Sequence, residues 1–267
     1  MEKCGPKVAL VLGAGSARGL AHIGVLQVLT DHHIPFHLII GCSMGAMIGG
    51  LYSCGTDLKM LDKMLQHMDV NTFFDVRIPR YGFIAGKKIS SFLKLMTKNK
   101  NFEDLDPPVI MVATDLISGQ EVQLNSGLVA DGIRASISIP GIFHPVKLDE
   151  MILVDGAVTN RLPIDIARSL EADITIAVDV TFCEGKQVNI NNTLDVILTS
   201  LDIMQKQQFD LVCDQADILI QPEVGGFSSR EFDNAGKIIQ LGREAAEKKI
   251  PEIIDQIKKY GEQNTAN

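Results

Sequence analysis

The sequence predicts an α/β fold built on a central mixed, mainly parallel β-sheet with helices on both faces. Short apolar runs rich in β-branched residues alternate with segments of helical periodicity. The apolar runs are hydrophobic without interruption, which is typical of parallel strands buried on both faces. With 267 residues, 46% hydrophobic and 22% charged, the chain can bury one sizeable core. We therefore expect a single domain over residues 1–267.

The first half of the chain is expected to supply two strand–helix units and a helical segment. The apolar β-branched runs predict strands at 7–12 and 36–40, and the helical periodicity predicts helices at 20–31 and 44–54. Two or three further helices are expected between 57 and 97.

The second half is expected to add a strand at 109–113, two hairpins, two late strands and two closing helices. Residues 117–120 separate the new strand from 121–124, and 149–150 join 146–148 to 151–154. The late strands are expected at 174–180 and 218–221. The closing helices fall within 230–260, and Pro251 suits the first turn of the second one.

Charge and cysteine usage narrow the class of protein. The formal net charge of -8 provides no basic field, so we do not expect a nucleic-acid partner. The five cysteines show no metal-binding or redox spacing, which favours reduced thiols in a reducing compartment. The N-terminal residues lack the apolar stretch of a signal peptide, and the apolar segment 38–51 is too short to span a bilayer. We expect a soluble, cytoplasmic protein.

A sharp strand-to-helix turn is predicted at Gly41-Cys42-Ser43-Met44-Gly45, which fits the pattern G-x-S-x-G. In this context the serine is a nucleophile, because the turn strains its backbone and exposes its hydroxyl. Gly41 and Gly45 leave out side chains that would collide in so tight a turn. The simpler alternative is that Ser43 only caps a helix. The strand before the turn and the helix after it favour the nucleophile.

A loop of small residues, Gly13-Ala14-Gly15-Ser16-Ala17-Arg18-Gly19, follows the first strand. Its backbone N–H groups can converge on an anion, either a nucleotide phosphate or the oxyanion of an acyl-transfer reaction. The spacing after Gly15 is one residue too long for a dinucleotide fingerprint, and no G-K-[ST] follows. The loop and Ser43 end the first two strands, so we favour the oxyanion. Arg18 either locks the loop or contacts an anionic head group, and we favour locking.

The base is predicted to be a carboxylate, because the usual triad order ends in histidine and no histidine follows His144. His22 is expected to be buried in the first helix and His144 to be structural. Asp155 ends a predicted strand, and Gly156 allows a tight turn that aims the carboxylate. Since aspartate has a reference pKa of about 3.9, the pair needs a desolvated Asp155 and strong oxyanion stabilisation. Alternatively, Asp155 only makes an Asx-turn.

Four blocks in this order resemble the patatin-like phospholipase family, in particular its compact bacterial cytoplasmic members. The blocks are the glycine loop continued through 18–26, the G-x-S-x-G at 41–45, the segment 134–143 and the D-G-A at 155–157. Together they are far more specific than any one motif. Recognisable blocks span about 8–180, and residues 181–262, which carry no readable motif, are expected to complete the same domain.

The resemblance implies a three-layer patatin-like fold and hydrolysis of the acyl esters of lipids without a metal or another cofactor. It implies that Ser43 and Asp155 form a catalytic dyad and that the N–H groups around Gly15, Ser16 and Ala17 form the oxyanion hole. The positions expected to support these motifs are Gly13, Arg18, Gly19, Gly41, Gly45 and Gly156. Ala14 and Ser16 stand where other members often carry glycine, which leaves the oxyanion geometry open.

We therefore expect a lipid acyl hydrolase of the phospholipase A or carboxylesterase type. The alternatives are an acyltransferase or thioesterase with the same nucleophile, and a nucleotide- or lipid-binding regulatory protein. The locally basic segment 86–100 either lies on an anionic membrane surface or packs its apolar face into the core, and we favour the core. The segment 137–143 lines either an acyl pocket or the core. The sequence indicates neither the head group nor the oligomeric state.

Overall fold

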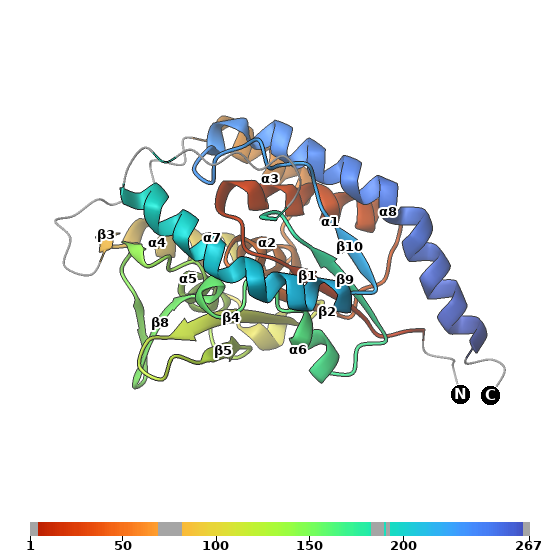
Figure 1. The fold of residues 1–267 in the computed structure, drawn as a ribbon, viewed down its shortest axis with the longest axis horizontal. Coiled ribbons are helices and arrows are strands. Elements are labelled where there is room, and N and C mark those ends of the chain that lie inside the picture. Colours follow the sequence, from red (N-terminus) through yellow and green to blue (C-terminus); the bar gives the residue numbers. More distant parts are fainter. Residues whose placement is uncertain (1–4, 69–81, 183–189, 191–192, 264–267) are drawn as a thin grey trace.

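The computed structural model describes residues 5–68, 82–182, 190 and 193–263 (Figure 1). Its centre is an eight-stranded mixed sheet with the strand order β10-β9-β1-β2-β4-β8-β7, and β5 also pairs with β4. The strands are β1 (Val8–Leu12), β2 (Leu38–Cys42), β4 (Val109–Asp115), β5 (Glu121–Leu124), β7 (Val146–Leu148), β8 (Met151–Asp155), β9 (Ile174–Val178) and β10 (Ile218–Ile220). The predicted fold class is confirmed.

The strands run parallel from β10 to β4 and turn antiparallel beyond it. The pairs β10–β9, β9–β1, β1–β2 and β2–β4 are parallel, whereas β5 and β8 pair antiparallel with β4, and β7 with β8. Both predicted hairpins are therefore confirmed, since β4–β5 and β7–β8 flank their expected turns. A small parallel pair, β3 (Gly82–Ile84) and β6 (Gly141–Phe143), lies outside the main sheet and was not predicted.

Helices cover both faces of the sheet (Figure 1). Alternate residues of β1 point into two separate hydrophobic clusters, Leu10 into one and Val11 into the other. One face packs against α1 (Ala21–Asp31), α2 (Met44–Ser53), α3 (Leu58–His67), α4 (Lys87–Met96), α5 (Val129–Ser136) and α8 (Ala235–Gln263). The other face is covered by α6 (Ile164–Ser169) and α7 (Thr193–Val212), from which Ile164, Ile166 and Phe209 enter the core. This burial on both sides is the reason the central strands β1, β4 and β9 are buried along their whole length and largely apolar.

The C-terminal helix corrects one prediction. The two closing helices expected within 230–260 are one helix, α8, with Pro251 inside it. Proline has no N–H and crowds the preceding turn, so it kinks a helix, yet packing can hold the helix together across it. Ile250 and Ile253 on either side of Pro251 are buried in the core, which holds both halves in one element. Figure 1 shows α8 bending along its length.

Two glycines let α8 lie directly on α1. A Cβ at Gly24 of α1 would stand 2.0 Å from the carbonyl oxygen of Ile239, and one at Gly242 of α8 would stand 2.1 Å from that of Ala21. Each glycine thus admits the backbone of the opposite helix. The C-terminal helix is in this way packed on the first helix of the chain. Within the described residues, no helix combines the length and the apolar character needed to cross a membrane.

Candidate active site

Ser43 occupies the predicted turn between a strand and a helix. β2 ends at Cys42, α2 begins at Met44, and Ser43 between them has φ 55° and ψ −118°. Few L-residues adopt this left-handed region, so the conformation is strained. The glycines on either side serve close approach: a Cβ at Gly45 would stand 2.0 Å from the carbonyl oxygen of Leu12, and one at Gly41 would stand 2.5 Å from Cα of Ala46.

Asp155 reaches Ser43 through the register of three neighbouring strands. Cys42 of β2 pairs with Val112 of β4, and the next residue, Ala113, pairs with Asp155 of β8. β8 is antiparallel to β4, so its carboxyl end, where Asp155 lies, points away from the edge of the sheet at which β2 and β4 end. Asp155 lies level with Ser43 because β8 ends partway along β4. The close contact of Gly156 with β4, where a Cβ would stand 2.3 Å from the carbonyl oxygen of Val112, holds the turn in place.

The two side chains form a short, buried hydrogen bond. The hydroxyl of Ser43 donates to Oδ2 of Asp155 over 2.6 Å, and the peptide N–H of Ala157 donates to Oδ1 over 2.8 Å. Burial raises the pKa of Asp155 to about 6, while the bonds from Ser43 and Ala157 and the charge of Arg161 oppose the rise. The carboxyl is thus a stronger base than a solvated aspartate, yet it is largely ionised at neutral pH.

Ser136 holds the backbone of Ser43 in place, and sequence reasoning gave it no role. Its hydroxyl accepts the peptide N–H of Ser43 over 2.9 Å and donates to the carbonyl of Val112 over 2.6 Å. The side chain therefore ties the strained turn to β4. Ser136 lies inside the block 134–143, but a serine at the end of a helix gives no signal by which its partner could be predicted.

The glycine loop runs beside this pair. It continues β1 into a short 3-10 helix at Ser16–Leu20. The peptide N–H groups of Gly15 and Ser16 have no acceptor among the described residues. The N–H of Ala17 donates to the carbonyl of Ser229 over 3.0 Å. Ser16 has φ 50°, so a position where relatives are expected to carry glycine does adopt the left-handed region. Two N–H donors are therefore available at the cavity.

The other loop residues that the sequence analysis selected support the loop. The peptide N–H of Gly13 donates to the carbonyl of Val178 over 3.0 Å, which ties the loop to β9. Its own carbonyl lies 2.8 Å from Nε2 of His22. Burial lowers the pKa of His22 to about 4, so its ring is neutral. Gly19 makes room for Met44, whose Cγ would stand 2.5 Å from a Cβ there.

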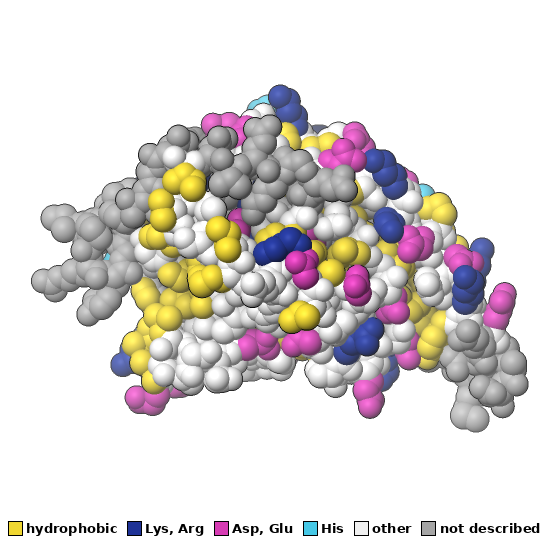
Figure 2. All heavy atoms as spheres, viewed as in Figure 1, with side chains coloured by type: hydrophobic (Ala, Val, Ile, Leu, Met, Phe, Trp, Pro, Cys, Tyr) yellow, Lys and Arg dark blue, Asp and Glu magenta, His cyan; other side chains and the backbone are white. Residues whose placement is uncertain are grey.

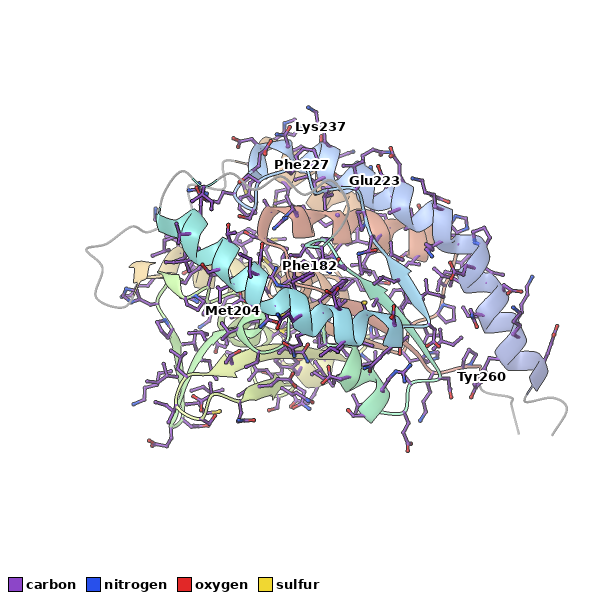
Figure 3. The ribbon with its side chains drawn as sticks, viewed as in Figure 1. Phe182, Met204, Glu223, Phe227, Lys237 and Tyr260 are labelled. Atoms are coloured by element: carbon purple, nitrogen blue, oxygen red, sulfur yellow. The ribbon has the colours of Figure 1, made fainter. Side chains whose placement is uncertain are left out.

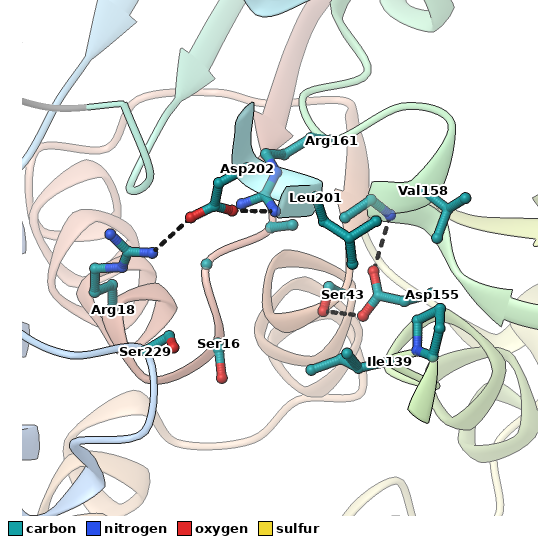
Figure 4. A pocket seen from close by; sticks show the side chains of 14 residues that line it. Ser16, Arg18, Ser43, Ile139, Asp155, Val158, Arg161, Leu201, Asp202 and Ser229 are labelled. Carbon is teal, nitrogen blue, oxygen red and sulfur yellow. Dashed lines mark hydrogen bonds and ion pairs between the residues drawn. The ribbon is translucent and has the colours of Figure 1, made fainter. Parts of the chain in front are cut away.

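A cavity of about 40 Å³ lies where these elements meet. Figure 4 shows Ser43 and Asp155 on one side of it and Ser16 and Arg18 on the other. Helix α7 closes it from above with Leu201 and Asp202. The remaining lining residues are Ala14, Gly15, Ile139, Pro140, Ala157, Val158, Arg161 and Ser229. No described histidine lines it, and the described residues hold no cluster of side chains suited to a metal ion.

Several predicted residues lie apart from this cavity. Of the segment 137–143, Ile139 and Pro140 line the cavity, whereas Phe143 is buried elsewhere. In α4, Leu93 is fully buried and Ile89 and Met96 pack against the core, so most of its apolar stripe faces inward; Leu95 is 75% exposed. Cys42, the residue before Ser43, is not suited to act as a nucleophile, because burial raises its pKa well above the usual value and keeps it a thiol.

Sequence reasoning missed the residues that close the cavity. Arg161 follows the D-G-A block by a few positions, and Asp202 comes from the C-terminal third, where no motif was found. A lone aspartate on a helix with exposed polar residues gives no sign of facing a buried arginine. Only the course of α7 across the site brings the two together (Figure 1).

Known proteins share both the motifs and the fold. Residues 10–168 match the model of the family described as patatin-like phospholipase. An uncharacterized NTE family protein of Mycobacterium tuberculosis is 36% identical over 182 residues, which cover 67% of this chain and 51% of that protein. Patatin-like phospholipase domain-containing protein 7 of Rattus norvegicus is 33% identical over 184 residues, 66% of this chain and 14% of that protein.

A solved structure extends the likeness to almost the whole chain. VipD from Legionella pneumophila matches with a TM-score of 0.60 and 12% identity, over 96% of this chain and 67% of that one. At this identity the match concerns the fold. The chain spans about half the length of the mycobacterial relative and a smaller part of the rat protein.

Proposed function

The chain belongs to the patatin-like phospholipase family, and on that premise we propose that it is a lipid acyl hydrolase with Ser43 as nucleophile and Asp155 as base. The observation that carries the proposal is the 2.6 Å hydrogen bond from the Ser43 hydroxyl to Asp155 at a strained strand-to-helix turn. A nucleophilic serine needs an acceptor for its proton within this distance. No described histidine lines the cavity to act in place of the carboxylate.

In the first step, Asp155 takes the hydroxyl proton as the Ser43 oxygen attacks the ester carbonyl. The carbonyl oxygen becomes an oxyanion, which accepts hydrogen bonds from the N–H groups of Gly15 and Ser16. The tetrahedral intermediate then expels the alcohol, which leaves with the proton from Asp155. An acyl chain is left on Ser43.

In the second step, water replaces the alcohol. The water oxygen attacks the acyl carbonyl while Asp155 takes a proton from the water. Asp155 then returns this proton to the oxygen of Ser43 as the fatty acid leaves. A base with a pKa of about 6 suits both steps, because it is ionised at neutral pH and still takes up a proton in the transition state.

Labelling with a fluorophosphonate tests the nucleophile and the base directly. We expect one adduct on Ser43 by mass spectrometry, no adduct in Ser43→Ala, and labelling slowed at least about hundredfold in Asp155→Asn, which keeps the size of the side chain but not its basicity. Ser118→Ala, a surface serine that bonds only to Asp115 and its own turn, is the matched control and should label at the wild-type rate. A folded wild-type protein that stays unlabelled would refute the proposal.

A further inference from the structure

The carboxylate of Asp202 lies between two arginines beside the candidate active site. Its Oδ1 is 2.7 Å from Nη2 of Arg161, and its Oδ2 is 3.7 Å from Nη2 of Arg18 (Figure 4). Arg18 comes from the glycine loop and Arg161 from the turn after Asp155. The two guanidinium groups thus approach one anion from the two segments that flank the reacting serine.

All three side chains are largely withdrawn from water. The exposed fractions are 6% for Arg18, 11% for Arg161 and 13% for Asp202. Buried arginines need an anion, because an uncompensated charge in the interior is costly. Nε of Arg161 is buried and finds no hydrogen-bond partner within the described residues, so this guanidinium keeps a spare donor.

Helix α7 carries this anion, and polar contacts of its described side chains help to hold it on the site. Besides Asp202, Asp195 pairs with Arg230 over 2.8 Å, and Gln205 donates to the carbonyl of Val158 over 2.8 Å. Phe209 is buried against Phe182 near the C-terminal end of the helix, where Figure 3 labels Phe182. Polar contacts exchange readily with water or with another anion, so the part of α7 over the cavity can detach while Phe209 holds the other end.

The outward face of α7 adds little to its attachment. Val196, Ile203, Met204 and Leu211 are between 49% and 77% exposed, and Figure 3 shows Met204 on this helix. Figure 2 shows hydrophobic side chains gathered on the surface at the end of this face where α7 begins. These side chains gain nothing from the closed position, because they face solvent in it.

The closed site is too small for an acyl ester. Its 40 Å³ is close to the space of one water molecule, whereas pockets for drug-sized ligands hold about 300 Å³ or more. Leu201 and Asp202 are the two lining residues that come from α7. An ester can therefore reach Ser43 only when a lining segment moves, and withdrawal of α7 would take the anion away from both arginines.

We propose that Arg18 and Arg161 form a binding site for the phosphate group of an acyl lipid, and that Asp202 occupies this site until the substrate phosphate replaces it. This assignment rests on the proposed function, since it places the phosphate beside an ester that Ser43 attacks. Two guanidinium groups suit a phosphate because each can offer paired N–H donors to its oxygens. Exchange of one anion for another keeps an anion beside both arginines while the cavity opens.

Binding of glycerol 3-phosphate, measured by calorimetry, tests the anion site without any catalysis. We expect Asp202→Asn to bind it at least about tenfold more tightly than the wild type, because the internal anion is gone. Asp255→Asn removes an exposed carboxylate of α8, leaves α7 and the arginine site unchanged and should bind like the wild type; glycerol is the uncharged control. The double variant Asp202→Asn, Arg161→Gln should lose the gain. Equal binding by wild type and Asp202→Asn would overturn the proposal.

A melting temperature of Asp202→Asn below that of the wild type is compatible with the proposal, and it provides a second measurement of anion binding. The loss of an anion beside two buried arginines destabilises the folded state, so we expect glycerol 3-phosphate to raise the melting temperature of this variant more than that of the wild type. An equal rise in both proteins would contradict the exchange of anions.

A matched pair of substrates tests whether the site serves a lipid phosphate or a free one. We expect Arg161→Gln to lower kcat/KM for a lysophosphatidic acid at least about tenfold more than for the monoacylglycerol with the same chain. Any effect of Arg161 on the pKa of Asp155 acts on both substrates and cancels in the ratio. Arg161→Lys should restore part of the preference, and Arg168→Gln, which alters a surface arginine of α6, should leave it unchanged.

These experiments distinguish failure of the phosphate site from failure of the proposed hydrolase function. If Ser43 labels and Arg161→Gln leaves the preference unchanged, Ser43 remains the nucleophile and the phosphate site is refuted as a substrate site, even where free phosphate binds. If glycerol 3-phosphate binds as expected but Ser43 never labels, the anion site stands as a site and its assignment to a substrate falls with the proposed function.

Discussion

The proposed base, a buried aspartate in place of histidine, would set the pH range in which this site works. Asp155 is buried, and its desolvation outweighs the three favourable interactions that stabilise its charge. The result is a carboxyl group with a pKa of about 6, near the value that general-base catalysis at neutral pH requires. The sequence could predict the need for this shift but not its extent, which depends on the neighbours that only the fold assembles.

We expect kcat/KM for a neutral ester to follow the ionisation of Asp155. The base form is the carboxylate, so the rate should be level above about pH 7 and fall about tenfold per unit below about pH 6. A pH profile from 4.5 to 8 measures this. Arg161→Gln should move the midpoint upward, because the charge of Arg161 lowers the pKa of Asp155. A midpoint near 4 would show that burial does not govern the base.

At the scale of single elements, the turn at Ser43 depends on a contact between helix α2 and strand β1. The backbone of Leu12 occupies the space where a side chain at residue 45 would begin. α2 can therefore start directly after the serine only when residue 45 is glycine. This contact is how the second glycine of G-x-S-x-G acts in this chain.

Gly45→Ala should destabilise the protein by about 3 kcal/mol, because α2 must move away from β1 to admit the methyl group. Chemical denaturation followed by circular dichroism measures the loss. The control is Gly226→Ala, where a Cβ would meet no atom within 4 Å, and it should change the stability by less than about 0.5 kcal/mol. Similar stability of the two variants would show that the contact can relax.

Secondary-structure elements that follow from a local sequence pattern could be predicted from the sequence. Uninterrupted apolar runs marked the parallel strands of the sheet, and polar turns marked both hairpins, because each pattern reflects the two-sided burial or the turn itself. The predicted break between two helices near Pro251 was wrong, because packing on both sides of the proline overrides its local effect on the helix. The pairing of Arg161 with Asp202 was beyond prediction, because it depends on where a helix without a motif crosses the sheet.

At the scale of the whole molecule, the C-terminal third of the chain is joined to the first third. β10 extends the sheet beyond β9, and α8 packs on α1 through Gly24 and Gly242. The family match ends at residue 168, yet the sheet and the cavity both continue past it. We propose that the chain folds as one unit, which the contacts between its ends require.

Gly242→Ala should therefore weaken the whole molecule rather than α8 alone. We expect a single unfolding transition in calorimetry, lowered by about 5–10 °C, since the added methyl group meets the carbonyl of Ala21. Gly261→Ala in the same helix, where a Cβ would meet open space, should leave the transition in place. Two separate transitions in Gly242→Ala would mean that α8 unfolds on its own and would refute one cooperative unit.

The strand register that aligns Asp155 with Ser43 also bears on how sequences of this kind can vary in length. The two side chains are 112 positions apart in the chain, but they are spaced by hydrogen bonds across β2, β4 and β8. Insertions and deletions in the intervening surface loops leave that spacing intact, whereas one residue added within β8 would turn its alternating side chains to the opposite faces. The chemistry can thus persist while the loops around it lengthen and diverge, provided that these three strands keep their alignment.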